Sequence, residues 1–224
     1  PLKVSFNASL SKRDFFSWTN EPPCDATGQA TRLCGMGIPT AEERAGGAAR
    51  IELYKGPTGH VTRFPRYNDP AVLLRTRRGR CGEWANCFTL IARAVGFEAR
   101  WVLDVTDHVW TEIWSHRQKR WLHADPCEGT CDAPMTYERG WGKKLSYVLA
   151  FSRYEVVDVT RRYSASWAAT RQRRLAVPEA WLADQIEQLT TASQAYLEAS
   201  AKSALAERAA WEERLLLARE EGGA

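Results

Sequence analysis

The chain of 224 residues has no long hydrophobic run and contains little cysteine and histidine. No window of about 18 apolar residues occurs, which argues against a membrane-spanning helix. The six cysteines form no regular disulfide framework for a chain of this length, so we interpret them as reduced thiols of an intracellular protein. The first residues include neither a starting methionine nor a secretory hydrophobic segment, so we expect a fragment of a longer protein.

The charge balance is also mild. The chain carries 31 basic and 27 acidic residues, and the resulting net charge of +4 neither requires nor excludes a polyanionic partner. Apolar residues make up 44% of the chain, enough to bury the core of one domain with an appendage. Tryptophan is abundant, with 10 residues, and these either fill a core or line a groove that recognises planar or sugar-like groups.

The first third of the chain is predicted to be mostly irregular. Residues 10–18 are typical of the end of an amphipathic helix, which Pro22 and Pro23 stop because proline cannot continue a helix. Residues 24–60 are rich in glycine and loop-like, apart from one strand expected at 49–54. A short helix is expected at residues 71–76.

Strands follow. Bulky or alternating apolar residues predict strands at 98–104, 109–114 and 120–124, and a further pair around 144–152 and 155–159. Helices first and an antiparallel sheet afterwards indicate an α+β fold.

The composition changes after residue 178. Alanine, leucine, glutamate, arginine and glutamine dominate up to residue 220, and the apolar spacing predicts one or two long amphipathic helices. We therefore divide the chain into a core at 1–165 and a helical C-terminal extension at 166–224.

The segment 79–88 contains a candidate catalytic cysteine. Gly79 and Gly82 flank Cys81, and a run with helical periodicity starts directly after it. The free backbone N–H groups and the dipole at a helix N-terminus favour a thiolate over a thiol, which makes Cys81 a candidate nucleophile. Taken alone, the pattern fits a small apolar residue packed at a turn equally well.

A cysteine nucleophile needs a base, and the chain offers four histidines. His60 and His116 lie in polar, loop-like surroundings. His108 opens a strand on which Trp110 and Glu112 share its face, because side chains in a strand alternate. Asp125 ends the next strand and is placed to accept a hydrogen bond from an imidazole. Cys81, His108 and Asp125 thus predict a triad on a helix start and two neighbouring strands.

Five segments resemble the cytoplasmic peptide:N-glycanase family, and the resemblance runs from about Asp14 to Tyr163. The spacing of Cys81, His108 and Asp125 agrees with that family as well. The segments are residues 79–88, 107–112, 120–128, 140–147 and 158–163.

The resemblance implies a fold and an activity. The fold is α+β, a transglutaminase-like, papain-related core with helices packed on an antiparallel sheet. The activity is the removal of N-linked glycans from asparagine of misfolded glycoproteins exported from the endoplasmic reticulum. It leaves aspartate and passes through a thioester. The expected location is the cytoplasm, with the nucleus as a second one. By resemblance Cys81 is the nucleophile, His108 the general acid–base and Asp125 the orienting carboxylate.

The resemblance also implies substrate contacts and partners. Trp18, Trp110 and Trp121 match family tryptophans near the cleft, and Glu112 is expected to bind sugar hydroxyls. The alternatives are core packing for each tryptophan and a solvated or ion-paired carboxylate for Glu112. A Rad23-type ubiquitin receptor and an AAA ATPase are the expected partners.

The chain departs from the family at its zinc site. The family carries two Cys-x-x-Cys pairs before the catalytic segment, a spacing suited to tetrahedral zinc. Here the first pair survives only as Cys24, and residues 54–60 contain no cysteine. Cys24, Cys34 and His60 offer three ligands, but their spacing fits no zinc pattern. We therefore expect no metal or other cofactor, and a degenerate zinc-knuckle-like insertion at 24–60 held by packing.

Three alternatives remain at this point. A protein-glutamine transglutaminase shares the core chemistry, so the triad alone does not distinguish it. A non-catalytic Rad4/XPC-like DNA-damage binding domain would use arginines such as Arg75 and Arg78 on phosphates, but its transglutaminase-like domain lacks the triad. Retention of all three triad residues argues against nucleic acid as a partner and against a catalytically silent glycanase homologue.

Overall fold

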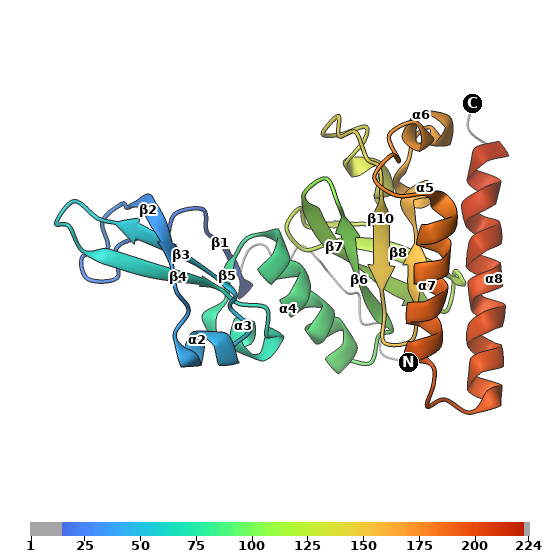
Figure 1. Ribbon diagram of the computed structural model, residues 1–224, viewed down its shortest axis with the longest axis horizontal. Helices are drawn as coiled ribbons and strands as arrows, with labels where there is room; N and C mark the ends of the chain where they lie inside the picture. Colours follow the sequence, from blue (N-terminus) through green and yellow to red (C-terminus); the bar gives the residue numbers. More distant parts are fainter. Residues whose placement is uncertain (1–14, 222–224) are drawn as a thin grey trace. The chain divides into compact units, whose positions relative to one another are not determined.

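A computed structural model describes residues 15–221 of the chain. The chain forms two compact units. Among the described residues, the first comprises 15–96 and 125–130, and the second comprises 97–124 and 131–221 (Figure 1). Within the described residues, no helix is both long and apolar enough to cross a membrane.

The first unit contains a three-stranded antiparallel sheet of order β2-β3-β4, with β2 at Arg32–Gly37, β3 at Arg50–Lys55 and β4 at Val61–Arg66. Helix α2 (Ala41–Ala45) lies between β2 and β3 in the chain. The prediction of a strand at 49–54 is confirmed as β3. The prediction of a loop before it is wrong at β2 and α2, because glycine-rich β2 pairs with β3 through the backbone despite its weak strand composition. Strand β4, which pairs with the other edge of β3, follows the predicted loop-like range.

The remaining elements of the first unit lead to Cys81. Strands β1 (Ser17–Trp18) and β5 (Arg78–Gly79) pair in parallel, and helices α3 (Pro70–Thr76) and α4 (Cys81–Ala94) follow the three-stranded sheet. The helices predicted at 71–76 and after Cys81 are confirmed. The helix predicted at 10–18 is wrong at its end, where the backbone of Ser17 and Thr19 bonds to residues 77 and 79 instead. Residues 10–14 lie outside the described residues.

The second unit is built on a six-stranded sheet of order β11-β10-β6-β7-β8-β9. The predicted strands are confirmed, and the pairs from β11 to β8 are antiparallel. A buried cluster around Trp110, Tyr137 and Tyr163 forms the core of this unit. The bounds are β6 Ala99–Asp104, β7 His108–Ser115, β8 Arg120–Asp125, β9 Thr130–Cys131, β10 Val148–Phe151 and β11 Val156–Asp158.

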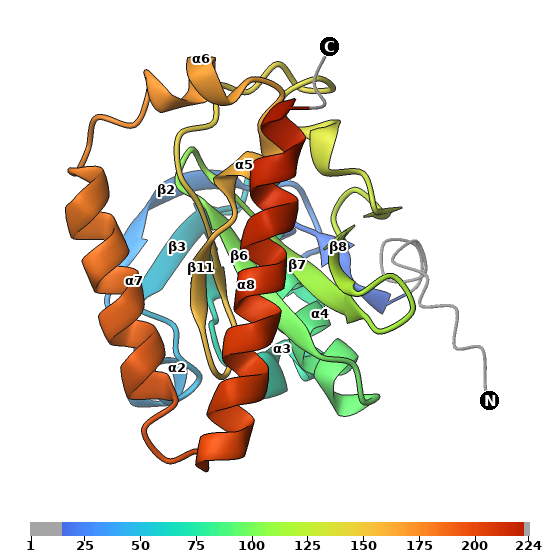
Figure 2. The same ribbon diagram turned by 90° about the vertical axis from the view of Figure 1, so that its right-hand side faces the viewer.

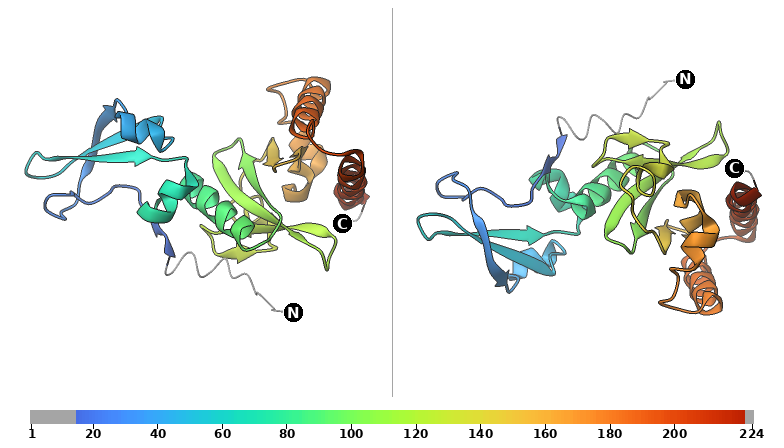
Figure 3. Two further views of the ribbon diagram at one scale, coloured as in Figure 1. Left: turned by 90° about the horizontal axis from the view of Figure 1, so that it is seen from below. Right: turned by 90° about the horizontal axis from the view of Figure 1, so that it is seen from above.

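Helices complete the second unit. The short helices η2 (Pro134–Thr136), α5 (Thr160–Tyr163) and α6 (Trp167–Arg171) precede the long helices α7 (Glu179–Ser193) and α8 (Ala199–Glu221). The long helices confirm the prediction for residues 178–220, and they lie side by side along the sheet (Figures 2 and 3).

Helix α7 also closes the edge of this sheet. The hydroxyl of Thr190 accepts a hydrogen bond from the backbone N–H of Val156 at 3.0 Å, where a further strand would otherwise pair. A helix side chain thus satisfies a polar group of edge strand β11.

Candidate active site

Cys81 is the first residue of helix α4. Its backbone lies where the N–H groups of a helix have no intrahelical partner, and its side chain is partly buried. The preceding turn is tight, because a Cβ atom on Gly79 would lie 2.4 Å from Cβ of Glu83. Only glycine fits there, and the chain is therefore held close to the helix that begins with Cys81.

Buried ion pairs fix this helix start. Glu83 accepts a hydrogen bond from the backbone N–H of Arg80 at 2.9 Å, which satisfies a donor just before the helix. Arg66 donates to both carboxylate oxygens of Glu83, at 2.5 and 2.8 Å. Glu52 accepts from Arg66 and from Arg80, and only 1% of Glu52 is exposed. Strands β3 and β4 thereby anchor the N-terminus of α4.

The pKa of Glu52 reflects this pairing. Burial alone would raise the pKa, but hydrogen bonds from Arg80, Tyr54 and Arg66 hold it at about 2. Glu52 is therefore a permanent anion at neutral pH, balanced by the arginines around it.

Cys127 lies close to both Cys81 and Asp125 in the first unit. Cys81 packs against a cluster that contains Cys127, Trp84 and Cys87. Burial raises the pKa of the Cys127 thiol far above its usual range, and electrostatic interactions with Asp125 and Cys81 add to this shift. Cys127 therefore stays a neutral, buried thiol beside the predicted nucleophile and its predicted carboxylate.

Asp125 is held by its own turn. It is fully buried at the last position of β8. Its Oδ1 atom accepts hydrogen bonds from the backbone N–H of Cys127 at 2.8 Å and of Glu128 at 3.2 Å. This turn fixes the orientation of the carboxylate.

His108 belongs to the second unit, where it is the first residue of β7 and 6% exposed. Three aromatic rings surround the imidazole: Trp141 at 5.0 Å, Tyr137 at 5.2 Å and Trp110 at 5.7 Å between ring centroids. Sequence reasoning did not assign Trp141 to this environment, because a tryptophan in an irregular segment gives no periodic signal.

Glu112 lies on the predicted face of β7 but is completely buried. Arg100 donates to Oε2, while Arg162 and Tyr163 both donate to Oε1, each at 2.6 Å. Burial alone would raise the pKa of Glu112, but the charges of Arg100 and Arg162 hold it at about 2. Both carboxylate oxygens are thus engaged inside the protein, and sugar binding by Glu112 stays a prediction.

Helix α8 supplies a further member of this network that sequence reasoning missed. The carboxylate of Glu212 accepts from Arg100 at 2.5 and 3.0 Å and from Arg162 at 2.6 Å. Only 3% of Glu212 is exposed. One glutamate in a helix rich in alanine, glutamate and arginine offers no signal that it is buried. We call Arg100, Glu112, Arg162 and Glu212 the buried charge network.

The three tryptophans predicted to flank a substrate differ in exposure. Trp18 is 50% exposed, and its indole N–H donates to Asn20. Trp110 is fully buried, stacks on Tyr137 and donates to the hydroxyl of Tyr163 at 2.7 Å. Trp121 is 1% exposed, with the guanidinium of Arg100 4.1 Å from its ring centroid. Of these three tryptophans, only Trp18 presents an open ring.

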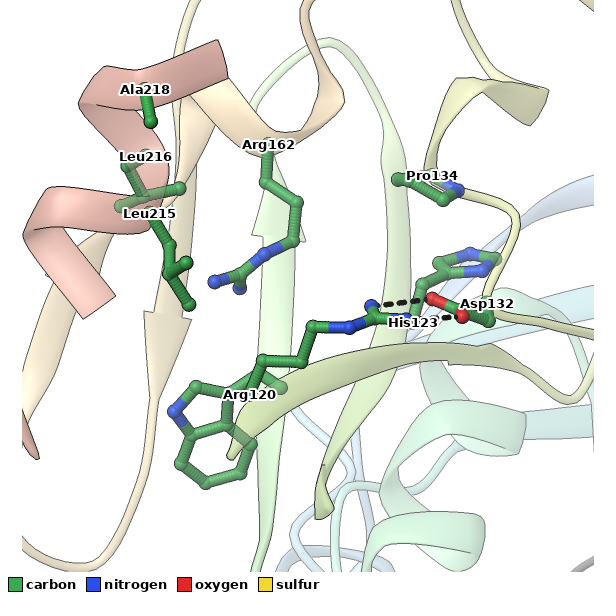
Figure 4. A pocket seen from close by; sticks show the side chains of 9 residues that line it. Arg120, His123, Asp132, Pro134, Arg162, Leu215, Leu216 and Ala218 are labelled. Carbon is green, nitrogen blue, oxygen red and sulfur yellow. Dashed lines mark hydrogen bonds and ion pairs between the residues drawn. The ribbon is translucent and has the colours of Figure 1, made fainter. Parts of the chain in front are cut away.

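A cavity of about 440 Å³ lies in the second unit between β8 and α8 (Figure 4). Arg120 in its wall donates to both oxygens of Asp132, at 2.7 and 2.6 Å. Leu215 and Leu216 of α8 form an apolar wall. Its other arginine, Arg162, is bound to Glu112 and Glu212, so both cations of the cavity already have carboxylate partners.

Three possible metal ligands meet in the first unit. Cys24, Asp25 and His60 offer ligand atoms that all lie within 4.8 Å of one another. Sequence reasoning considered Cys34 instead of Asp25, but Cys34 is an exposed residue of β2 and is not in this group. Thiolate, imidazole and carboxylate are all zinc ligands, so the donor set suits zinc although it is not the four-cysteine set of the resembled family.

Comparison with known proteins gives two matching family models. The model described as the transglutaminase-like superfamily matches residues 37–126, and the Rad4 transglutaminase-like domain matches residues 104–217.

Curated relatives share about half of the aligned residues. A protein of Arabidopsis thaliana named peptide-N(4)-(N-acetyl-beta-glucosaminyl)asparagine amidase is 54% identical over 178 residues, which are 78% of this chain and 24% of the relative. Proteins of the same name from Gallus gallus and Homo sapiens are 53% and 52% identical over 88% of this chain, and 31% and 30% of the relatives. The chain thus spans about a quarter to a third of the length of these relatives.

Solved structures support the fold. A crystal structure of Rad4–Rad23 bound to a 6-4 photoproduct UV lesion matches 70% of this chain and 37% of that chain, with a TM-score of 0.52 and 20% identity. A structure of Rad4–Rad23 crosslinked to undamaged DNA matches with a TM-score of 0.50 at 20% identity, over 71% of this chain and 38% of that chain.

Proposed function

The chain belongs to the transglutaminase-like superfamily, and from this premise we propose that it acts as a peptide:N-glycanase, an amidase that removes N-linked glycans from asparagine. The observation that carries the proposal is the position of Cys81 at the start of α4, in a chain more than 50% identical to several curated amidases of that name. We further propose that Cys81, His108 and Asp125 act together as its triad.

The first half of the reaction is acyl transfer. The thiolate of Cys81 attacks the side-chain carbonyl carbon of a glycosylated asparagine and forms a C–S bond. The imidazolium of His108 gives its proton to the departing nitrogen, the C–N bond breaks, and a glycosylamine leaves. The backbone N–H of Cys81, at the helix start, is the first donor to the oxyanion.

Hydrolysis of the thioester completes the reaction. His108, now neutral, takes a proton from a water molecule that attacks the thioester carbon. The C–S bond breaks, Cys81 leaves as a thiolate, and the former asparagine is released as aspartate. Asp125 orients the imidazole throughout and stabilises its charged form. The fixed carboxylate of Asp125 and the aromatic enclosure of His108 support these two roles.

Substrate recognition is proposed at the tryptophans. Trp18, half exposed, is the residue we assign to direct contact with the glycan. A supporting role within the second unit is assigned to the buried residues Trp110, Trp121 and Glu112. The two tryptophans fill the interior, and Glu112 neutralises the charges of Arg100 and Arg162 there. The substrates are misfolded glycoproteins, handled in the cytoplasm with a Rad23-type receptor and an AAA ATPase. The partners rest on the family resemblance alone.

The test is a deglycosylation assay on a denatured high-mannose glycopeptide, read by mass spectrometry. The wild-type chain is expected to convert asparagine to aspartate, and Cys81→Ala is expected to lose this conversion. Cys34→Ser, which replaces an exposed thiol of β2, serves as the matched control and should retain it. Failure of the wild type, or conversion by Cys81→Ala, would contradict the proposal.

The same preparation distinguishes the neighbouring activities. A protein-glutamine transglutaminase would incorporate a primary amine into a glutamine-containing protein without releasing any glycan. A Rad4-like domain would do neither and would bind duplex DNA. The likeness to the Rad4 structures is confined to the fold at 20% identity, so the amidase is the function that we propose.

A further inference from the structure

His108 is the first residue of β7 and comes directly after the turn that joins β7 to β6. The turn is closed by a hydrogen bond from the N–H of Asp107 to the carbonyl of Asp104, at 3.1 Å. Asp107 has a left-handed backbone, with φ at 78°. A turn followed by a left-handed residue is a common connection between antiparallel strands. The place from which the imidazole projects is therefore set by the conformation of residues 104–107.

The carboxylate of Asp104 holds this turn from inside, and the residue is fully buried. Its Oδ1 atom accepts a hydrogen bond from the backbone N–H of Thr106 at 2.9 Å. The hydroxyl of Thr106 lies 2.7 and 2.8 Å from the two carboxylate oxygens. Bonds of this type stabilise a turn that begins with aspartate. A buried carboxylate also needs a cation, because an unpaired charge away from water is costly.

Lys143 supplies that cation. Its Nζ atom lies 2.6 Å from Oδ2 of Asp104, and only 19% of the lysine side chain is exposed. The two residues are 39 positions apart, so the ion pair joins the turn of His108 to the segment that follows η2. Solvent and salt screen a largely buried pair less than a surface pair.

The segment of Lys143 also carries Trp141. The backbone N–H of Trp141 donates to the carbonyl of Thr136 at 3.0 Å, and the N–H of Lys143 donates to the carbonyl of Tyr137 at 3.0 Å. These bonds hold the segment against η2 and the residue after it. The indole of Trp141 lies 5.0 Å from the imidazole of His108. Lys143 is thus two residues from a ring that encloses the imidazole.

We propose that Lys143 and Asp104 are positioning residues, which fix the imidazole of His108 and the indole of Trp141 relative to each other. The proposal rests on the amidase function proposed above, in which His108 moves the proton. Asp104 sets the turn from which the imidazole projects, and Lys143 sets the segment from which the indole projects. The ion pair joins these two supports, and it is assigned no contact with the substrate.

Kinetics on a high-mannose glycopeptide are the first part of the test. Lys143→Met removes the cation but keeps a long side chain. It is expected to lower kcat about tenfold to a hundredfold, because a displacement of about 1 Å at a reacting group has an effect of that size. The change in KM should be small, since the pair is not assigned to substrate binding. Lys143→Arg keeps the cation and should retain most of the parent kcat.

Two further variants isolate the ion pair. Asp104→Asn keeps an oxygen for Thr106 but removes the charge. Combined with Lys143→Met, it should lower kcat no further than Lys143→Met alone, because residues that act as a pair are not additive. Lys144→Met changes the exposed neighbouring lysine and should leave kcat and KM unchanged.

The ring signals of His108 in a nuclear magnetic resonance spectrum report its position without any reaction. The chain has only four histidines, so labelling with 13C-histidine gives few ring signals, and His108→Gln assigns that of His108. In Lys143→Met the His108 signal is expected to shift or broaden. The signal of His123, which is buried in the same sheet, should keep its position and report an intact fold. Both signals should stay in place in Lys144→Met.

The two parts of the test separate this proposal from the amidase. An unchanged His108 signal in Lys143→Met, an unchanged kcat, or a joint displacement of the His108 and His123 signals would refute the positioning role. A parent chain that released no glycan would refute the amidase function instead. A selective shift of His108 in Lys143→Met would still support the link between Lys143 and His108 in that case.

Discussion

The carboxylate of Glu212 in α8 lies 2.5 Å from the guanidinium of Arg100 in β6, and neither side chain is open to solvent. The same carboxylate binds Arg162, which in turn binds Glu112. Two arginines and two glutamates therefore balance one another in the interior of the second unit. Helix α8 is an integral part of that unit, since without Glu212 the network would hold a buried positive charge.

Glu212→Gln is expected to destabilise the chain strongly. The change removes the carboxylate that Arg100 and Arg162 share, and loss of one partner from a buried ion pair costs about 3–5 kcal/mol. The free energy of unfolding in urea, followed by circular dichroism, measures this loss. Glu213→Gln is the control, because Glu213 is exposed on the same helix. It should change the value by about 0.5 kcal/mol or less. Equal stabilities of the two variants would contradict the role assigned to Glu212.

The buried charge network also predicts acid sensitivity. The pKa of Glu112 is about 2 in the folded chain against an ordinary value of 4.5, so its contribution to stability is complete above about pH 4.5. That contribution is lost progressively as the pH falls from 4.5 towards 2, because the unfolded state takes up the proton first. Urea unfolding at a series of pH values should show this decline.

Salt separates the buried network from surface ion pairs. In 1 M salt the screening length is about 3 Å, and exposed pairs weaken while buried pairs weaken much less. The decline below pH 4.5 should therefore persist in 1 M salt. A stability that stays constant between pH 4.5 and 2 would show that Glu112 is not held as an anion.

The turn before Cys81 can be tested with two glycines. In Gly79→Ala the new Cβ atom would lie 2.4 Å from Cβ of Glu83, an atom that cannot move without the helix itself. We expect a loss of about 1–3 kcal/mol in the free energy of unfolding.

Gly82→Ala provides the comparison, since a Cβ atom there meets nothing within 4 Å and the residue lies inside α4. Alanine is favoured over glycine in a helix by about 0.5–1 kcal/mol, so this variant should be at least as stable as the parent. Equal losses in the two variants would rule out the close approach of Gly79 and Glu83 as the cause.

Trp141 is expected to support the proposed acid–base residue. Its ring lies 5.0 Å from the imidazole of His108 and is 44% exposed. An aromatic pair contributes about 0.5–1.5 kcal/mol beyond burial, so Trp141→Ala should lower the rate of deglycosylation by about tenfold or less. The kinetic constants kcat and KM, measured on a glycopeptide, report the effect.

Trp181→Ala removes a tryptophan of α7 that is equally open to solvent, at 50% exposure, and should leave the rate unchanged. If Trp141→Ala also left it unchanged, the aromatic enclosure of His108 would have no part in the reaction.

The sequence predicted the elements that carry periodic signals. Helix α4, strands β6 to β8 and the two long C-terminal helices have regular apolar spacing, and the structure confirms them. Strand β2 could not be predicted, because its sequence contains two glycines and its exposed residues show no alternation. Its pairing with β3 is a long-range backbone interaction that composition does not encode.

The candidate site was predictable to a similar extent. Local patterns placed Cys81 at a helix start, His108 and Asp125 on neighbouring strands, and Glu112 on a face of β7, as the structure has them, while their role as a triad stays a prediction. They did not show that Glu112 is buried between two arginines, nor that Asp25 lies beside Cys24 and His60 as a third donor. Those relationships join residues far apart in the chain, and no short window of sequence contains them.

The bond between Arg100 and Glu212 joins residues 112 positions apart. During synthesis the strand of Arg100 leaves the ribosome long before α8, so Arg100 can pair with Glu112 of the neighbouring strand well before Glu212 is available. Contacts of such separation form late, because closing a long loop costs entropy before it is rewarded. A chain halted before Glu212 would thus lack one carboxylate partner of both Arg100 and Arg162, and α8 is the element that completes the interior of the second unit.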